Sequence, residues 1–163
     1  MKVLLLNGSP RKNGCTYTAL NVVADALKAE GIDAEVFQAG DPDMENVKAA
    51  AAKLKDSDAL VVGSPVYWAS PSGQIIEFMD RLASVAGKDM LYKPAAAVAS
   101  ARRAGTTATL DVLTKYFSYH QMPVVSSLHL TPWKAGYGSA AADWAERHRS
   151  HGQWYWPPLT YEG

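Results

Sequence analysis

Short apolar runs alternate with longer amphipathic stretches along most of this chain. Residues 3–6 and 59–62 are continuously apolar and are each followed by a glycine-containing turn, a pattern typical of strands buried on both faces of a parallel sheet. Within 16–30, apolar residues recur at spacings of three and four, which is the period of a helix with one buried face. This alternation predicts βαβ units, and therefore an α/β fold with a parallel sheet and helices on both faces.

The same pattern predicts where each element lies. We expect strands at residues 3–6, 33–37, 59–62, 94–99 and 123–127, and helices at 16–30, 42–55, 72–84, 106–119 and 139–150. Ser72 is a suitable helix N-cap and Gly31 a suitable helix stop. Ligands of such sheets bind at the carboxyl ends of the strands, so the loops after the first, third and fourth strands are the places to search.

The size and charge of the chain limit the classes of function it can have. The 163 residues amount to about one domain. Sixteen basic residues balance sixteen acidic ones, so no general field attracts nucleic acid or an anionic membrane. The single cysteine, Cys15, excludes an internal disulfide and a multi-cysteine cluster. The first apolar run is too short for a signal or membrane-spanning segment, and we expect a cytoplasmic protein with neither membrane nor nucleic-acid partner.

The loop after the first strand is rich in glycine and in side chains that bind anions. Its hydroxyls and cations are Ser9, Arg11, Lys12, Thr16 and Thr18. They precede or begin a helix, whose N-terminus adds free N–H groups and the positive end of the helix dipole. The loop matches neither the Walker A nor the dinucleotide fingerprint, so it predicts a site for a mononucleotide phosphate. The alternative is an ordinary capping loop in which Thr16 caps the helix and the basic pair is solvated.

Cys15 stands at the start of the same helix and has two interpretations. A helix N-terminus can lower the pKa of a thiol and make it a reactive thiolate. Alternatively, Cys15 is a small side chain whose backbone N–H faces the phosphate. We favour the second interpretation, because a bound phosphate would oppose formation of a thiolate.

The loops after the third and fourth strands supply aromatic and basic groups. Tyr67 and Trp68 lie in a proline-stiffened segment, 63–73, and suit a flat heteroaromatic ring; the alternative is that they cap the core. Gly105 permits close approach of the backbone to a ligand. Arg102 and its neighbour Arg103 suit an anionic ring edge or the 2′-phosphate of NADPH; the alternative is a solvated pair.

Together the three loops resemble the NADPH-dependent FMN reductase family of flavodoxin-like proteins. The resemblance rests on Gly8-Ser9-Pro10-Arg11-Lys12 with Gly14 and Thr16, on Gly63-Ser64-Pro65-Val66-Tyr67-Trp68, and on Ala101-Arg102-Arg103 with Gly105-Thr106-Thr107. It implies that the FMN phosphate is bound by Ser9, Arg11, Cys15, Thr16 and Thr18. It implies that the isoalloxazine ring contacts Pro65, Val66, Tyr67 and Trp68, and that the ring edge contacts Ala101, Arg102 and Gly105.

The resemblance spans residues 1–127 of what we expect to be a single flavodoxin-like domain, 1–163, with a five-stranded parallel sheet. Residues 128–163 are atypical and hold four of the five tryptophans. Within them, residues 153–158 have no recognised counterpart and would dock on a partner subunit or cover the flavin. Some relatives are iron-sulfur flavoproteins with a cysteine motif after the second strand. Residues 40–55 contain no cysteine, which excludes such a cluster.

The implied function is that of an oxidoreductase with bound FMN, which takes electrons from NADPH or NADH and passes them to a small-molecule acceptor. We expect no catalytic side chain, because the flavin carries the chemistry, and no metal, because no His, Asp and Glu cluster has metal-ligand spacing. Two alternatives stay open: an FMN electron carrier without a nicotinamide step, and a reductase whose acceptor is a quinone, azo or nitroaromatic compound. By analogy of fold, we expect a homodimer or homotetramer, with the helix at 75–82, including Phe78 and Asp80-Arg81, as a contact.

Overall fold

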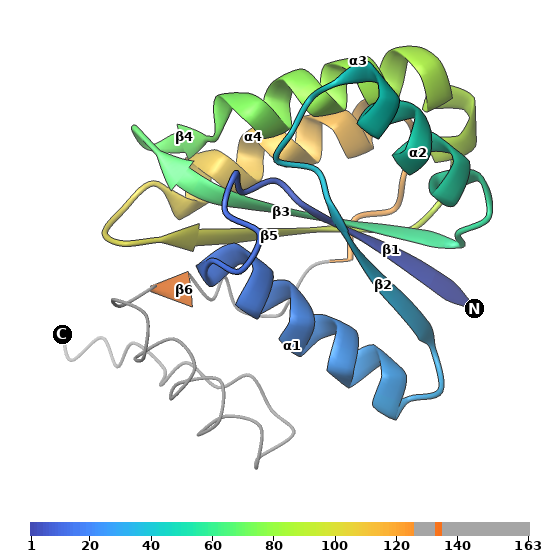
Figure 1. The fold of residues 1–163 in the computed structure, drawn as a ribbon, viewed down its shortest axis with the longest axis horizontal. Helices are drawn as coiled ribbons and strands as arrows, with labels where there is room; N and C mark the ends of the chain where they lie inside the picture. The colour runs from blue at the N-terminus through green and yellow to red at the C-terminus, as the bar shows by residue number, and fades with distance from the viewer. Residues whose placement is uncertain (126–132, 135–163) are drawn as a thin grey trace, which may run out of the picture.

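A parallel sheet of five strands, sandwiched between helices, makes up the described part of the chain (Figure 1). The computed structural model describes residues 1–125 and 133–134. The strands are β1 (Lys2–Asn7), β2 (Asp33–Gln38), β3 (Ala59–Tyr67), β5 (Ala95–Ala101) and β6 (Trp133–Lys134), with β4 (Ser70–Pro71) antiparallel to β3. The helices are α1 (Cys15–Ala29), α2 (Met44–Lys55), α3 (Gly73–Met90) and α4 (Thr106–Tyr119). The strand order β2-β1-β3-β5-β6 is that of a flavodoxin-like doubly wound sheet, which confirms the predicted fold class.

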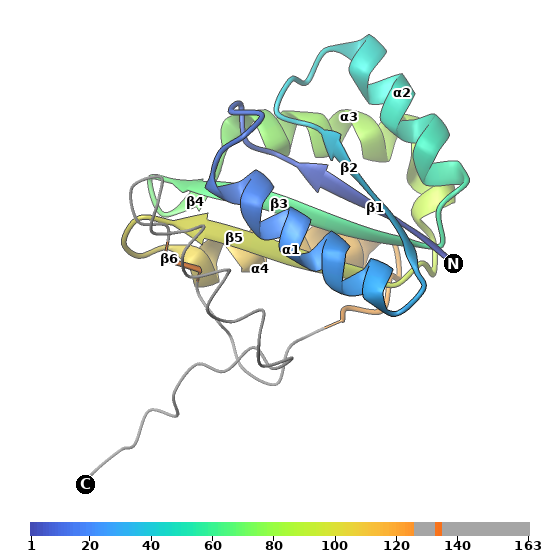
Figure 2. The same ribbon diagram turned by 60° about the horizontal axis from the view of Figure 1, so that its bottom comes forward.

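Helices cover both faces of the sheet, and β1 shows how the sequence specifies this. Within the described residues, α1 lies on one face, whereas α2, α3 and α4 lie on the other (Figures 1 and 2). Leu4 and Leu6 pack into the core on the three-helix side, while Val3 and Leu5 pack beneath α1. Successive residues of a strand point to opposite faces, so a strand covered on both sides is apolar throughout. None of the helices in residues 1–125 is long and apolar enough to cross a membrane.

The helix ends follow their capping residues. After α1, Gly31 has a φ of +75°, and its N–H bonds to Lys28 O while Ile32 N–H bonds to Leu27 O, both at 3.0 Å; these bonds form a Schellman motif. Ser72 caps α3 by accepting the N–H of Ile75 at 3.3 Å. The helix α3 continues beyond residue 84, where we expected it to end, through a kink at Ala86 to Met90.

The fifth strand differs from the expected segment, 123–127. Val124 forms only an isolated bridge with Ala95, at the start of β5, and residues 126–127 lie outside the described part. The strand β6 instead pairs Trp133 and Lys134 with the carboxyl end of β5. A strand of two residues has no continuous apolar run, so hydrophobic periodicity does not indicate it. The expected helix at 139–150 and the tryptophan-rich tail lie outside the described residues.

Candidate functional site

The three predicted loops meet at the carboxyl edge of the sheet. The first loop (residues 8–14) follows β1, the hairpin (residues 64–72) comprises the end of β3 and β4, and the third loop (residues 102–105) follows β5. Gly8 N–H bonds to Gly63 O at 2.8 Å, and the Ser72 hydroxyl donates to Gly8 O at 2.8 Å. The first loop is therefore fastened to the hairpin.

A ring of three hydrogen bonds surrounds the backbone of Ser9. Ser9 N–H donates to Asn7 Oδ1 at 3.2 Å, Asn7 Nδ2 donates to Gln38 Oε1 at 2.7 Å, and Gln38 Nε2 donates to Ser9 O at 2.6 Å. Gly40 packs closely against this turn and leaves no room for a side chain, because a Cβ at that position would lie 2.0 Å from Ser9 O. Asn7, Gln38 and Gly40 are not among the site residues predicted from the sequence. The available signal for Asn7 and Gln38 is that each is a polar residue at the end of a strand.

The start of α1 is open to an anion. Gly14 is the N-cap and supplies no side-chain bond, and the first bond of the helix runs from Thr18 N–H to Gly14 O at 3.0 Å. The N–H groups of residues 15–17 therefore have no acceptor within the helix. Ser9 Oγ accepts Arg11 N–H at 3.1 Å, which leaves the proton of its hydroxyl available. The exposed Arg11 and Lys12 add positive charge.

Two predicted phosphate hydroxyls make bonds within the protein. Thr16 is 1% exposed, and its Oγ1 lies 2.6 Å from Ser100 Oγ, so it ties α1 to β5. Thr18 Oγ1 donates to Gly14 O at 3.3 Å. Cys15 is the first residue of α1 and is half-buried with a free thiol. The side-chain bonds of Thr16 and Thr18 therefore stay within the protein. These three residues contribute to the site mainly by forming the start of α1.

The segment after the third strand is a hairpin rather than the expected loop. The strand β3 runs on to Tyr67, and Tyr67 pairs with Ser70 of β4. Trp68 and Ala69 form the turn with φ values of 53° and 58°, a left-handed conformation that residues other than glycine rarely adopt. Trp68 is 99% exposed and Tyr67 is 42% exposed, so the interpretation that Trp68 caps the core is wrong.

Two buried serines hold the base of the hairpin. Ser64 Oγ accepts Ser72 N–H at 3.1 Å and donates to Pro65 O at 2.8 Å. Pro65 and Val66 are half-buried beside them. Because these polar groups are paired out of water, the hairpin is held in one position relative to the first loop.

The third loop packs against the tip of the hairpin. Gly105 has a φ of +98°, and a Cβ there would lie 2.6 Å from Ala69 Cα and 2.9 Å from Val66 Cγ1. A side chain at this position would push the two loops apart. Ala101 is buried, whereas Arg102 is exposed beside Arg103.

The residues at this edge fit FMN. The open helix start, the Ser9 hydroxyl and two cations suit a phosphate dianion, and the exposed aromatic hairpin suits a planar ring. Within residues 1–125 and 133–134, no group of three or more His, Cys, Asp or Glu side chains could hold a metal ion.

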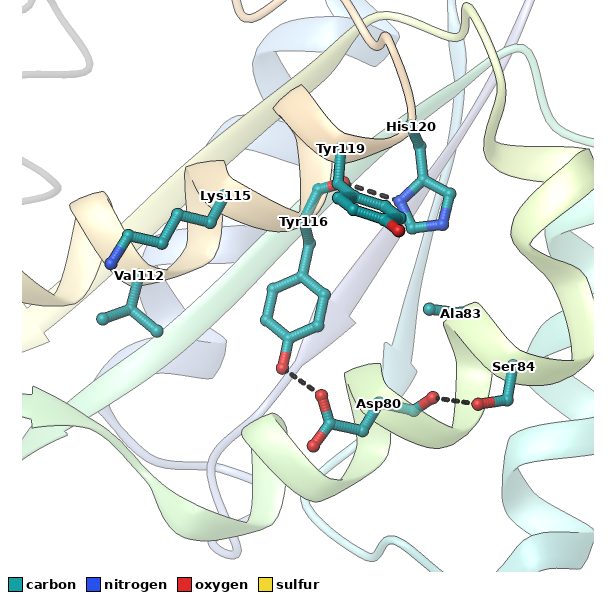
Figure 3. Close-up of a pocket in the computed structure, with 8 residues that line it drawn as sticks. All are labelled: Asp80, Ala83, Ser84, Val112, Lys115, Tyr116, Tyr119 and His120. Atoms are coloured by element: carbon teal, nitrogen blue, oxygen red, sulfur yellow. Dashed lines mark hydrogen bonds between the residues drawn. The ribbon is translucent and has the colours of Figure 1, made fainter.

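A groove of about 620 Å³ lies elsewhere, between α3 and α4 (Figure 3). It is lined by Asp80, Ala83, Ser84, Val112, Lys115, Tyr116, Tyr119 and His120. The Tyr116 hydroxyl points at Asp80 and donates to its Oδ1 at 2.5 Å (Figure 3). Burial, and then the hydrogen bond and charge of Asp80, raise the pKa of Tyr116 above its ordinary value. The groove uses the last turns of α4 and is separate from the three loops.

Comparison with known proteins agrees with this geometry. Residues 1–133 match the family described as NADPH-dependent FMN reductase. An iron-sulfur flavoprotein of Methanocaldococcus jannaschii is 29% identical and covers 87% of this chain and 84% of its own length. An NADPH azoreductase of a Bacillus species is 30% identical over 108 residues, which are 62% of this chain and 59% of that protein.

Solved structures share the fold at lower identity. An NADH:FMN oxidoreductase in its apo form has a TM-score of 0.67 at 20% identity, covering 93% of this chain and 87% of its own. A flavodoxin from the domain Archaea has a TM-score of 0.67 at 17% identity, with coverages of 90% and 92%. The single cysteine of the sequence cannot supply the thiolates of an iron-sulfur cluster. The chain belongs to the NADPH-dependent FMN reductase family and is an FMN-dependent NAD(P)H oxidoreductase.

Proposed function

We propose that the first loop binds the FMN phosphate and that the hairpin and the third loop hold the isoalloxazine ring. The observation that carries this assignment is the uncapped start of α1 beside a serine hydroxyl with a free proton. The FMN would supply hydride acceptance from the nicotinamide and electron release to the acceptor. The ring would lie along residues 65–68, beside Ala101 and Gly105.

Each group of the chain has a distinct task in this assignment. The Ser9 hydroxyl and the N–H groups of residues 15–17 donate hydrogen bonds to the phosphate, and Arg11 offsets its charge. Thr16 and Thr18 set the position of the helix start through their own bonds. On the third loop, Arg102 supplies positive charge to the edge of the ring.

The phosphate assignment predicts that Arg11→Ala weakens FMN binding by about threefold to tenfold, because an exposed cation contributes modestly. Fluorescence titration of the apoprotein measures this. Lys28→Ala is the matched control, since Lys28 is an exposed cation in the last turn of α1, at the end of the helix away from Arg11. Unchanged affinity in Arg11→Ala would remove Arg11 from the phosphate site.

The acceptor is proposed to be a small molecule, either a free flavin, a quinone or an azo compound. The Bacillus relative, named as an NADPH azoreductase, supports an azo compound among these. Purified protein with FMN is mixed with NADPH or NADH, and the nicotinamide absorbance is followed with added flavin, quinone or azo dye. We expect FMN-dependent oxidation that one acceptor accelerates; FMN binding without oxidation under any acceptor would instead identify an electron carrier.

The assembly is proposed to be a cytoplasmic homodimer or homotetramer. Phe78 is completely buried and packs against Phe37 with ring centroids 6.5 Å apart, while Arg81 donates to Pro42 O at 2.6 Å. Phe78 therefore serves the subunit's own core and Arg81 is bonded within the subunit, so the exposed Val85 and Tyr119 are better contacts on this side. Light scattering after size exclusion measures the mass, and a monomer would contradict the proposal.

A further inference from the structure

The ring around Ser9 has only one consistent arrangement of donors and acceptors. Ser9 N–H can only donate and Ser9 C=O can only accept, so Asn7 must turn its oxygen, and Gln38 its nitrogen, towards Ser9. The remaining amide groups of Asn7 and Gln38 then face each other as donor and acceptor at 2.7 Å. The two backbone groups of Ser9 are thus both held by side chains of neighbouring strands.

The two side chains that hold Ser9 come from the strands of the sheet. Asn7 and Gln38 are partners in the last rung of the β1–β2 register. Asn7 is completely buried and Ser9 is 4% exposed, and hydrogen bonds removed from water hold their geometry strongly. The side chain of Ser9 is left outside the ring and carries the hydroxyl that accepts Arg11 N–H.

We propose that Gln38 is a positioning residue of the phosphate site, which acts through Ser9 to set the shape of the first loop before FMN arrives. This inference rests on the proposed function above. Pro10, Arg11, Lys12 and Asn13 are exposed, so little packing orders this loop. Ordering it in advance removes an entropic cost from binding. Gln38 itself is engaged on both sides of its amide, by Asn7 and by Ser9.

The test compares FMN with riboflavin, which has the same ring and no phosphate. Gln38→Met keeps the length of the side chain and removes both bonds of its amide. We expect this variant to bind FMN about tenfold more weakly and to bind riboflavin within about twofold of the wild type. Gln121→Met is the matched control: Gln121 is exposed at the opposite end of the sheet, after α4, and this variant should bind both flavins normally.

A second variant gives a test that can be reversed within one folded protein. Gln38→Glu keeps an acceptor for Asn7 but loses the donor to Ser9 O while its carboxyl group is ionised. Protonation restores an O–H donor, so its FMN affinity relative to that of the wild type should recover as the pH falls. Gln38→Met has no titrating group and should show no such recovery.

The outcomes separate the inference from the proposed function. Equal weakening of FMN and riboflavin, or no change in either, would overturn the role of Gln38 in the phosphate site. A pH-independent deficit in Gln38→Glu would do the same. If the wild type binds neither flavin, the proposed function itself fails, and that result is visible before any variant is measured.

Discussion

Gly105 is the residue whose backbone most directly determines how the loops of the site fit together. Its φ of +98° disfavours any residue with a side chain, and an ideal Cβ there would lie only 2.6 Å from Ala69 Cα. We expect Gly105→Ala to lower the free energy of unfolding by about 1–3 kcal/mol and to weaken flavin binding. Urea denaturation and a flavin titration measure the two effects.

Gly73→Ala is the control for this substitution. No atom lies within 4 Å of a Cβ at Gly73, and alanine is the better helix former at the first residue of α3. This variant should be as stable as the wild type or slightly more stable. If Gly105→Ala behaved in the same way, the loop contact would be unimportant.

The positions of single residues in the candidate site were predictable when their chemistry was visible in the sequence. Ser9 and Arg11 lie beside the start of α1, as predicted, and their contact with a phosphate stays a prediction. The bond between Thr16 and Ser100 spans 84 positions, and no local pattern reports such a partner. Gln38 likewise needs the β1–β2 register before its neighbour Asn7 can be known.

At the scale of elements, the hairpin carries an unusual turn. Two-residue hairpin turns with positive φ at both positions favour Asn-Gly, yet here they hold Trp68 and Ala69. Trp68→Asn should therefore raise the free energy of unfolding by about 1 kcal/mol, and should lower kcat/KM because the exposed ring is lost from the proposed flavin site. Ala69→Gly relieves the same strain and keeps the ring, so it should retain activity. Equal activity in both variants would show that the indole has no role.

The contact between α3 and α4 predicts a pH dependence. Tyr116→Phe removes the bond to Asp80 and should cost about 1 kcal/mol of stability at neutral pH. The pKa of Tyr116 is raised in the folded protein, so above pH ~10 the unfolded chain loses this proton first and the wild type loses stability. The difference in the free energy of unfolding between the wild type and Tyr116→Phe has its full size below that pH and shrinks above it. Denaturation between pH 7 and 11 measures it; a constant difference would contradict the role of Asp80.

Elements were predictable where periodicity and capping agreed. The bounds of α4 coincide with the expected 106–119 because a glycine precedes it and apolar residues recur through it. The hairpin was missed because Gly63, Ser64 and Pro65 are typical of loops, although here they continue β3. Pairing with β5, through Ser64–Ala99 and Pro65–Ser100, overrides that local preference.

For the whole molecule, the flavin should act as a stabilising ligand. At a free FMN concentration about 100 times its dissociation constant, binding adds about 2.7 kcal/mol to the free energy of unfolding. For a chain of this length, that raises Tm by roughly 5–10 °C. Thermal denaturation with and without FMN measures the shift, and riboflavin should give a smaller one. Equal shifts would contradict a contribution from the phosphate.

The strand β2 forms an outer border of the described sheet and pairs along its length with β1 alone. Border strands are among the first parts of a sheet to fray, and here one of them is fastened to the turn that we propose as the phosphate site. Fraying of this strand and occupancy of the turn are therefore linked, so a bound phosphate should slow amide hydrogen exchange in β2. Slippage of the strand by one residue would turn Gln38 to the opposite face and release the turn, so this pairing would keep the proposed flavin site assembled.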